Sequence, residues 1–600
     1  MSRLHTIDIT VTLAAPWLVH GNDPGRLGLD AVLMRDRAGQ ALLPGTLLVG
    51  RIADAWHELR THFGAHQLPH AEDWFGREAR DFVPSHGRIH TSDLPCPKGS
   101  ESGTATANRI QCNDDSGAVE PGMLMLAEQE HAPGQKVSFA GRWRAWLSEA
   151  EVAPLRTALL AGLLWQDQLG AMASVGLGEV LGATVDVKAV PLPPQPQAAA
   201  GGRTRRLALT FNGPLCVGVR GTAAGNLFDS TDIVPGAAIK AAMAEMWRHW
   251  RSYTGPLGDG NTPLAKAFDA LRVSHAFPAA DRQRRPGRLP LSLVVSRSGA
   301  VLDAVQCPQA ELPEGAAPRF SIDWKGEDWG RACASQGWGE TRRELRVRTA
   351  ISRTSRTAEE GKLFAYECHV AVGDTVWLAD LALPDSVPQP EAVWKELEQL
   401  LAVGIGPIGK TAAWGDALLQ DTAVLTADVW SADDLLTLPS SVVLQLQTPA
   451  LLFAADAVAE QPSVDLLALY RSSFGELSGE ALELQHFFAS QALAGGEYLM
   501  RRYASKVPQR PQGQQRFLPY VLTQPGSVFV LNARAGRETD ALKILRQWRQ
   551  MGLPLPADAR RVHGDGWSLN PFVPENGYGE VTVNANHGFP AVQPTAQEAA

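Results

Sequence analysis

At 600 residues the chain exceeds the size of one ordinary hydrophobic core, so we expect two to four domains. Its 44% hydrophobic and 20% charged residues are typical of a soluble globular protein, and its apolar runs are too short to predict a membrane-spanning helix. Six scattered cysteines without a CxxC pair disfavour a disulfide framework or a structural zinc site. The net charge of −9 does not indicate nucleic-acid binding by itself, but such binding depends on where the cations lie.

Three parts of the chain share one order of predicted elements. Each begins with an alternating strand and a turn and ends with a glycine-rich turn that leads into a strand. The opening strands are predicted at 9–21, 207–218 and 442–454, and the closing segments at 174–187, 402–419 and 574–585. Because residues 1–21 alternate in polarity and lack the layout of a signal peptide, we expect a cytoplasmic protein.

Helical spacing of apolar residues lies between these ends. Pro-Gly pairs begin predicted helices at 44–60 and 235–250, and second helices at 151–170 and 391–406 run directly into the glycine-rich turns. A helix before the last strand favours an α+β fold of tandem ferredoxin-like, RRM-like units. The glycine turns follow helices and open strands, which is the reverse of the dinucleotide-binding order.

Composition also predicts the domain boundaries. A stretch rich in Pro, Ala and Gly marks a linker at 191–204, between a first unit at 1–190 and a second unit at 205–428. A weaker boundary precedes a third lobe at 440–590. Arginines gather at 282–288 and again at 342–356, and we expect such basic strips to hold RNA or to form solvated faces.

Longer motifs repeat within the first two units. Residues 74–93 and 107–141 of the first unit have counterparts at 271–278 and 346–380 of the second. With the Pro-Gly helices and closing glycine loops, this order resembles the RAMP (repeat-associated mysterious protein) superfamily of CRISPR systems. The first unit resembles the type III backbone subunit of the Cas-seven type. The remainder resembles the Cas-five-type subunit of type III-D systems, which caps the guide RNA at its 5′ tag.

The resemblance places Asp30 at the position of a catalytic aspartate that cuts target RNA with a divalent metal. It therefore implies Mg²⁺ as a cofactor and Asp30 as its ligand, because hard carboxylates suit Mg²⁺. Asp36 nearby is interpreted as a turn residue, and Asp229 in the second unit does not match the catalytic spacing.

Contacts with RNA are predicted for hairpin arginines, helix-start residues and glycine loops. The set is Arg51, Arg109, Lys240, Arg348, Arg353, Gly176, Gly178, Gly404, Gly406 and Lys410. Two positions depart from the family pattern, because Val49 replaces the expected helix-start lysine in the first unit and Ala241 replaces glycine after Lys240.

The predicted function is an RNA-binding subunit of a type III-like CRISPR effector complex. Its expected partners are guide RNA, target RNA, further RAMP backbone subunits, a large polymerase-like subunit and a small helical subunit, with no membrane. Two alternatives stay open: a structural scaffold in which Asp30 is idle, and a metal-independent endoribonuclease that processes the guide with a histidine.

Overall fold

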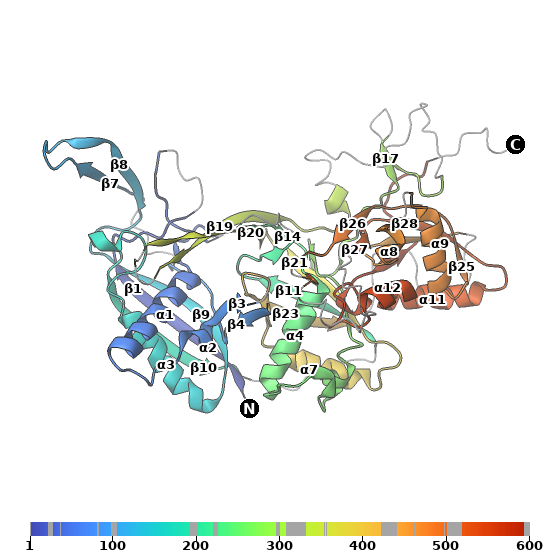
Figure 1. The fold of residues 1–600 in the computed structure, drawn as a ribbon, viewed down its shortest axis with the longest axis horizontal. Helices are drawn as coiled ribbons and strands as arrows, with labels where there is room; N and C mark the ends of the chain where they lie inside the picture. The colour runs from blue at the N-terminus through green and yellow to red at the C-terminus, as the bar shows by residue number, and fades with distance from the viewer. Residues whose placement is uncertain are drawn as a thin grey trace.

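The structure is a computed structural model, and its described residues are 2–21, 28–36, 38–80, 83–97, 105–191, 202–219, 226–295, 301–307, 332–352, 355, 357–421, 441–459, 463–496, 499–500 and 519–592. They form three lobes side by side along the long axis of the molecule (Figure 1). We call residues 2–191 the first lobe, 202–421 the second and 441–592 the third. Helices and sheets are mixed in every lobe, which confirms the α+β class.

Each lobe contains a strand–helix–strand–strand–helix–strand series whose first and third strands are central in an antiparallel sheet. In the first lobe the sheet order is β10-β1-β9-β5. Its elements are β1 (Arg3–Ala14), α1 (Gly45–His62), β5 (Ile89–His90), β9 (Lys136–Leu147), α3 (Glu149–Leu164) and β10 (Val180–Ala189). Along β1 the buried Ile7, Ile9 and Val11 alternate with less buried polar residues, so one sheet face packs on the helices.

The second lobe repeats the same order as β15-β21-β11-β23, with β22 added at one edge and β16 also paired with β21. Its elements are β11 (Thr204–Phe211), α4 (Gly236–Arg251), β15 (Arg272–Val273), β16 (Phe277–Ala279), β21 (Val376–Ala382), α7 (Pro390–Leu401), β22 (Ile405–Ile408) and β23 (Ala413–Asp421). The predicted helices at 44–60 and 235–250 are α1 and α4. Helix α7 ends before the predicted 406, because Gly404 adopts a φ of +88° that leaves the helical region.

The third lobe has the sheet order β25-β28-β24-β29. Its elements are β24 (Val442–Leu446), α9 (Leu466–Leu477), β25 (Leu482–Phe488), β28 (Val528–Ala533), α11 (Glu538–Met551) and β29 (Val581–Val583). Strands β26 (Gln491–Ala494) and β27 (Tyr520–Thr523) pair beside it, and α8 (Asp456–Ala459) and α12 (Ala557–His563) are additional helices. Three separate repeats of one strand order explain why one chain holds three principal hydrophobic cores.

Smaller elements extend from this framework. Strands β7 (Ala105–Cys112) and β8 (Val119–Gln129) form a hairpin that projects from the first lobe, and β19 (Thr341–Ile351) and β20 (Ala358–Ala371) form the equivalent insertion in the second (Figure 1). The others are β2 (Leu42–Leu43), α2 (Ala71–Phe75), β3 (Gly76–Arg80), β4 (Val83–His86), β6 (Leu94–Pro95), β12 (Val217–Gly218), β13 (Leu227–Phe228), β14 (Ser230–Thr231), α5 (Pro263–Ala267), β17 (Leu293–Val295) and β18 (Val301–Asp303).

The first two lobes share apolar packing. Leu4 of β1 and Trp146 of β9 belong to the core of the second lobe rather than to that of the first. Most of the linker predicted at 191–204, namely 192–201, lies outside the described residues. The lobes are therefore joined by buried side chains and not only by the connecting chain.

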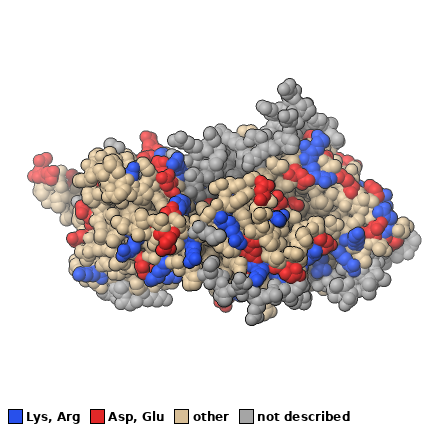
Figure 2. All heavy atoms as spheres, turned by 90° about the horizontal axis from the view of Figure 1, so that it is seen from below, with Lys and Arg blue, Asp and Glu red and all other residues tan. Residues whose placement is uncertain are grey.

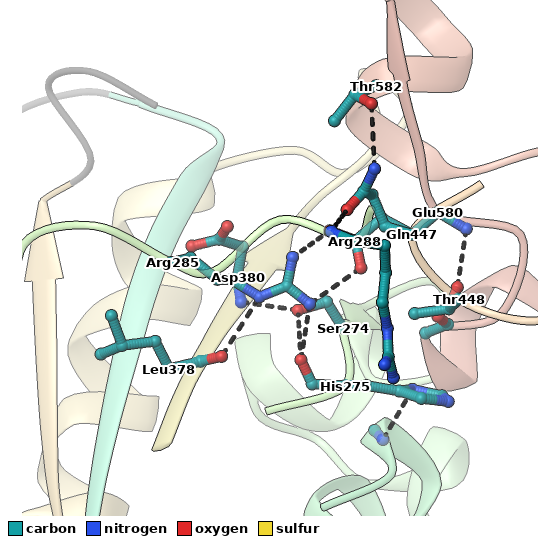
Figure 3. A network of polar contacts seen from close by, with 12 residues as sticks. Ser274, His275, Arg285, Arg288, Leu378, Asp380, Gln447, Thr448, Glu580 and Thr582 are labelled. Carbon is teal, nitrogen blue, oxygen red and sulfur yellow. Dashed lines mark hydrogen bonds and ion pairs between the residues drawn. The ribbon is translucent and has the colours of Figure 1, made fainter. Parts of the chain in front are cut away.

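A buried polar network joins the second and third lobes (Figure 3). Arg285 and Glu580 form a paired ion contact, with Nη1 to Oε1 at 2.5 Å and Nη2 to Oε2 at 2.9 Å, and both residues are 8% exposed. Arg288 donates its backbone N–H to Gln447 of the third lobe at 2.8 Å. The arginine cluster predicted as a basic strip at 282–288 thus supplies this junction with Arg285 and Arg288, which are turned inward.

Candidate nucleic-acid interface

A groove lies between the first and second lobes, with a cavity volume of about 630 Å³. Strand β9 and residues 90–95 line it from one side, and β19 and residues 410–416 from the other. Strand β19 reaches from the second lobe toward the first (Figure 1), and Arg346 Nη1 on β19 binds Asp93 Oδ2 of the first lobe at 2.6 Å. The insertion of the second lobe is thereby tied to the first lobe at the groove.

Two arginines of the groove are committed to ion pairs. Arg142 Nε binds Asp8 Oδ1 at 2.6 Å, and Arg346 binds Asp93 and also Glu344, whose Oε1 lies 3.0 Å from Nε. Burial alone would lower the pKa of Arg346, but the two carboxylates outweigh it and raise the pKa. These arginines fix the walls of the groove, so they contribute little net positive charge toward a ligand.

Three further cations of the groove lie over aromatic rings. Arg144 lies 5.4 Å from the ring centre of Trp414, Arg348 lies 5.1 Å from that of Tyr366, and Lys410 Nζ lies 4.0 Å from that of Phe228. Such contacts hold a cation at a partly exposed position while leaving its hydrogen-bond donors available. These cations are therefore the groove residues best placed to meet phosphate oxygens.

The rings beneath Arg348 and Lys410 form an aromatic cluster, which we define as Phe228, Phe364 and Tyr366. Phe228 on β13 is stacked with Tyr366 on β20 at 5.1 Å and 16°, and with Phe364 at 6.4 Å and 28°. The three rings are half-buried, so part of each faces solvent. Half-exposed rings flanked by cations can stack on unpaired nucleobases while the cations contact the backbone of a single strand.

Of the predicted RNA-binding residues, the structure brings Arg348 and Lys410 together at this groove. Gly404 and Gly406 lie behind them, and a Cβ atom at either position would meet the ring of Trp414, at 2.5 Å and 2.8 Å respectively. Because neither glycine has a side chain, the Trp414 ring can pack against both of them. The two glycines therefore position Trp414, which lines the groove, and form the turn after α7.

Lys240 lies inside the second lobe. The residue has no exposed surface, and Nζ donates to the carbonyl oxygens of Leu271 at 2.7 Å and Asp269 at 3.2 Å. Burial lowers the pKa of Lys240 to about 7. Because its ammonium group has no route to a phosphate in this arrangement, we do not retain Lys240 among the proposed RNA contacts.

Four of the remaining predicted contacts lie in the first lobe, away from the groove lining. Arg51 is partly exposed on α1, and Arg109 is exposed on the β7–β8 hairpin, where Nη1 lies 3.3 Å from Met172 Sδ. Gly178 is buried, and a Cβ there would collide with the carbonyl of Leu169, whereas Gly176 is exposed with open space around it. Arg353 lies outside the described residues.

Asp30 is exposed beside the base of the β7–β8 hairpin. Its Oδ2 accepts from the backbone N–H of Leu126 at 2.7 Å, and its own N–H donates to the Leu126 carbonyl at 2.8 Å. Within the described part of the chain, no cluster of three or more His, Cys, Asp or Glu side chains could hold a metal ion. Among the described residues, Asp30 is therefore a single carboxylate and not part of a multi-residue Mg²⁺ site.

Sequence reasoning did not select Arg144, Phe228 or Tyr366 as RNA contacts, although Tyr366 lies in the repeated motif at 346–380. These residues come from β9, β13 and β20, which are far apart in the sequence. The alternation of β9 between buried and exposed residues was the one available signal for Arg144. On the face drawn in Figure 2, Lys and Arg are interspersed with Asp and Glu.

No family model and no curated protein matches the sequence. The solved structures that align with parts of it include two chains from type III-B Cmr-beta complexes. One, from the cryo-EM structure of the Type III-B Cmr-beta bound to cognate target RNA, aligns with a TM-score of 0.23 and 17% identity, over 31% of this chain and 61% of that chain. Another is from the cryo-EM structure of the Type III-B Cmr-beta bound to cognate target RNA and AMPPnP, state 1. It aligns with a TM-score of 0.29 and 10% identity, over 54% of this chain and 86% of that chain. No helix in the described ranges has the length and apolar character needed to cross a membrane.

Proposed function

We propose that the chain is an RNA-binding subunit of a type III-like CRISPR effector complex, and that it holds guide RNA in the groove between its first two lobes. The observation that carries this proposal is that Arg348 and Lys410 line this groove and also lie over the half-exposed aromatic cluster. RNA would be held mainly through its sugar-phosphate backbone, while base pairing of the guide reads the target.

The repeated strand order supports the assignment to tandem ferredoxin-like units. In each lobe the fourth strand borders the first, and the third lies between the first and the second, with a helix after the first strand and another after the third. This is the connectivity of the split βαβ plan. Together with the sequence motifs that resemble the RAMP superfamily, it favours a backbone-type first lobe and a capping unit made of the other two.

The proposal is tested by measuring RNA affinity of the full chain against salt concentration. The ligand is a fluorescent single-stranded RNA that carries a type III CRISPR repeat sequence, and the readout is fluorescence anisotropy. Each lost phosphate contact should reduce the slope of log affinity against log salt by about 0.7. We therefore expect the double variant Arg348→Ala, Lys410→Ala to bind RNA more weakly, and the magnitude of its slope of log affinity against log salt should fall by about 1.4.

A matched control removes the same charges from the outer helix of the third lobe. Lys543 and Arg546 are exposed on α11, so the double variant Lys543→Ala, Arg546→Ala has the same net charge as the groove variant. If both double variants weaken binding equally, the groove is not the RNA site. If the wild-type chain shows no binding at low salt, the RNA-binding function itself is refuted.

The nuclease role of Asp30 stays a prediction within this proposal. The hydrogen bonds that the side chain and the N–H of Asp30 make with the backbone of Leu126 already account for the position of Asp30, as a structural scaffold would require. The other effector subunits are also proposed partners, and co-purification of small RNA and neighbouring gene products with the tagged chain would identify them. Repeat-derived guides with a uniform 5′ tag are the expected result.

A further inference from the structure

Two cysteines meet across paired strands beneath the aromatic cluster. Leu215 and His369 exchange both backbone hydrogen bonds, with N to O distances of 3.0 Å and 2.8 Å, in an antiparallel bridge. The next pair in this register is Cys216 opposite Cys368. It is a non-hydrogen-bonded pair, in which Cα atoms lie about 4.5 Å apart, and disulfides span Cα separations of about 4.4–6.8 Å.

Hydrogen bonds of the Cys216 backbone agree with this register. Its N–H donates to Thr411 Oγ1 at 3.1 Å, and its carbonyl accepts from the N–H of Lys410 at 2.8 Å. Both groups therefore point away from Cys368. The backbone of Cys216 holds the turn that carries Lys410, while Cys368 lies two residues beyond Tyr366 on β20.

The register places the two side chains on the same side of the paired strands, and both cysteines are fully buried. The neighbouring Cys368 thiol, together with the charges of Lys410 and Arg348, outweighs burial and lowers the pKa of Cys216 to about 7. The neighbouring Cys216 and burial raise the pKa of Cys368. Cys216 is thus the more readily ionised, nucleophilic member of the pair.

We propose that Cys216 and Cys368 form an oxidisable dithiol whose disulfide ties the Lys410 turn to β20. With a peroxide as the oxidant, the Cys216 thiolate attacks one peroxide oxygen and becomes a sulfenic acid as the O–O bond breaks. The Cys368 sulfur then attacks the Cys216 sulfur, the S–S bond forms, and the hydroxyl leaves as water. In sum, two thiols and one hydrogen peroxide give one disulfide and two waters.

The test uses the full chain with exposed Cys112 replaced, as Cys112→Ser, so that intermolecular links are avoided. The reduced protein is treated with hydrogen peroxide, and in parallel it is equilibrated with mixtures of oxidised and reduced glutathione. Free thiols are then alkylated, and peptides are mapped by mass spectrometry. We expect a peptide that links Cys216 to Cys368 and an intact mass lower by two hydrogens.

Variants separate this pair from other cysteine chemistry. In a Cys368→Ser background the link should vanish, and Cys216 should be trapped as a sulfenic acid by dimedone. The linked protein should also show slower hydrogen exchange across 215–218 and β20 than the reduced protein. The proposal is overturned if both cysteines remain fully alkylated under both oxidants while Cys112 of the wild-type chain is oxidised. Unchanged exchange in the linked protein would refute the tie between the turn and β20. None of these readouts depends on RNA binding.

Discussion

Replacing Glu580 by Gln tests how the second and third lobes are held together. The carboxylate of Glu580 is paired with both terminal nitrogens of Arg285, and its Oε2 lies 3.9 Å from Nη2 of Arg272. Arg272 is 3% exposed, and its Nε and Nη2 have no hydrogen-bond partner among the described residues. Its pKa is lowered by burial, which the charge of Glu580 partly offsets. The Glu580→Gln variant keeps the shape of the side chain but leaves two buried guanidinium groups without this counter-charge.

Removing one partner of a buried ion pair costs about 3–5 kcal/mol, because the remaining charge stays desolvated. We expect a loss of that size in the free energy of unfolding, measured by urea titration with tryptophan fluorescence. Since a chain of three lobes need not unfold in one step, limited proteolysis should accompany the titration. Faster cleavage near the junction of the second and third lobes is the expected result.

An exposed ion pair of the third lobe provides the control. Arg534 Nη2 lies 2.8 Å from Glu480 Oε2, and the two side chains are 47% and 58% exposed. Exposed pairs contribute about 0–1 kcal/mol, so the Glu480→Gln variant should be close to the wild type. If Glu580→Gln costs no more than Glu480→Gln, the buried network does not hold the lobes together.

Three further predictions concern single positions. Gly404 has a φ of +88°, so the Gly404→Ala variant should lose at least about 1–2 kcal/mol of stability, and an unchanged thermal midpoint would contradict this. The added Cβ should also displace Trp414, which would shift the tryptophan emission. Burial and neighbouring arginines lower the pKa of His275 from 6.5 to about 3. The unfolded chain therefore takes up this proton first, and stability falls as the pH drops below 6.5. Between about pH 8 and about pH 5 the wild type should therefore lose about 2 kcal/mol more than His275→Asn, and equal losses would show that His275 titrates normally. The Asp30→Asn variant keeps an acceptor for the Leu126 N–H but removes the charge of the side chain. If Asp30 is catalytic, this variant should abolish metal-dependent cleavage of complementary RNA by the assembled complex. Retained cleavage would favour the scaffold alternative.

Local elements of this chain follow from its sequence because their signals are short in range. Pro-Gly pairs with apolar residues at helical spacing mark α1 and α4, and alternating polarity marks β1. The glycine turns at Gly176 and Gly404 are also local, since a positive φ favours glycine. Repetition of these signals was enough to predict three similar segments.

Tertiary structure alone decided which side chains meet at the groove and which are withdrawn from solvent. Lys240 and Arg285 look like surface cations in the sequence, yet both are buried against partners that lie elsewhere in the chain. Phe228 reaches Lys410, and Cys216 reaches Cys368, only because strands distant in sequence come into register. Periodicity reports which face of an element is apolar, but it carries no information about which element covers that face. That choice depends on long-range strand pairing and on the burial of charge.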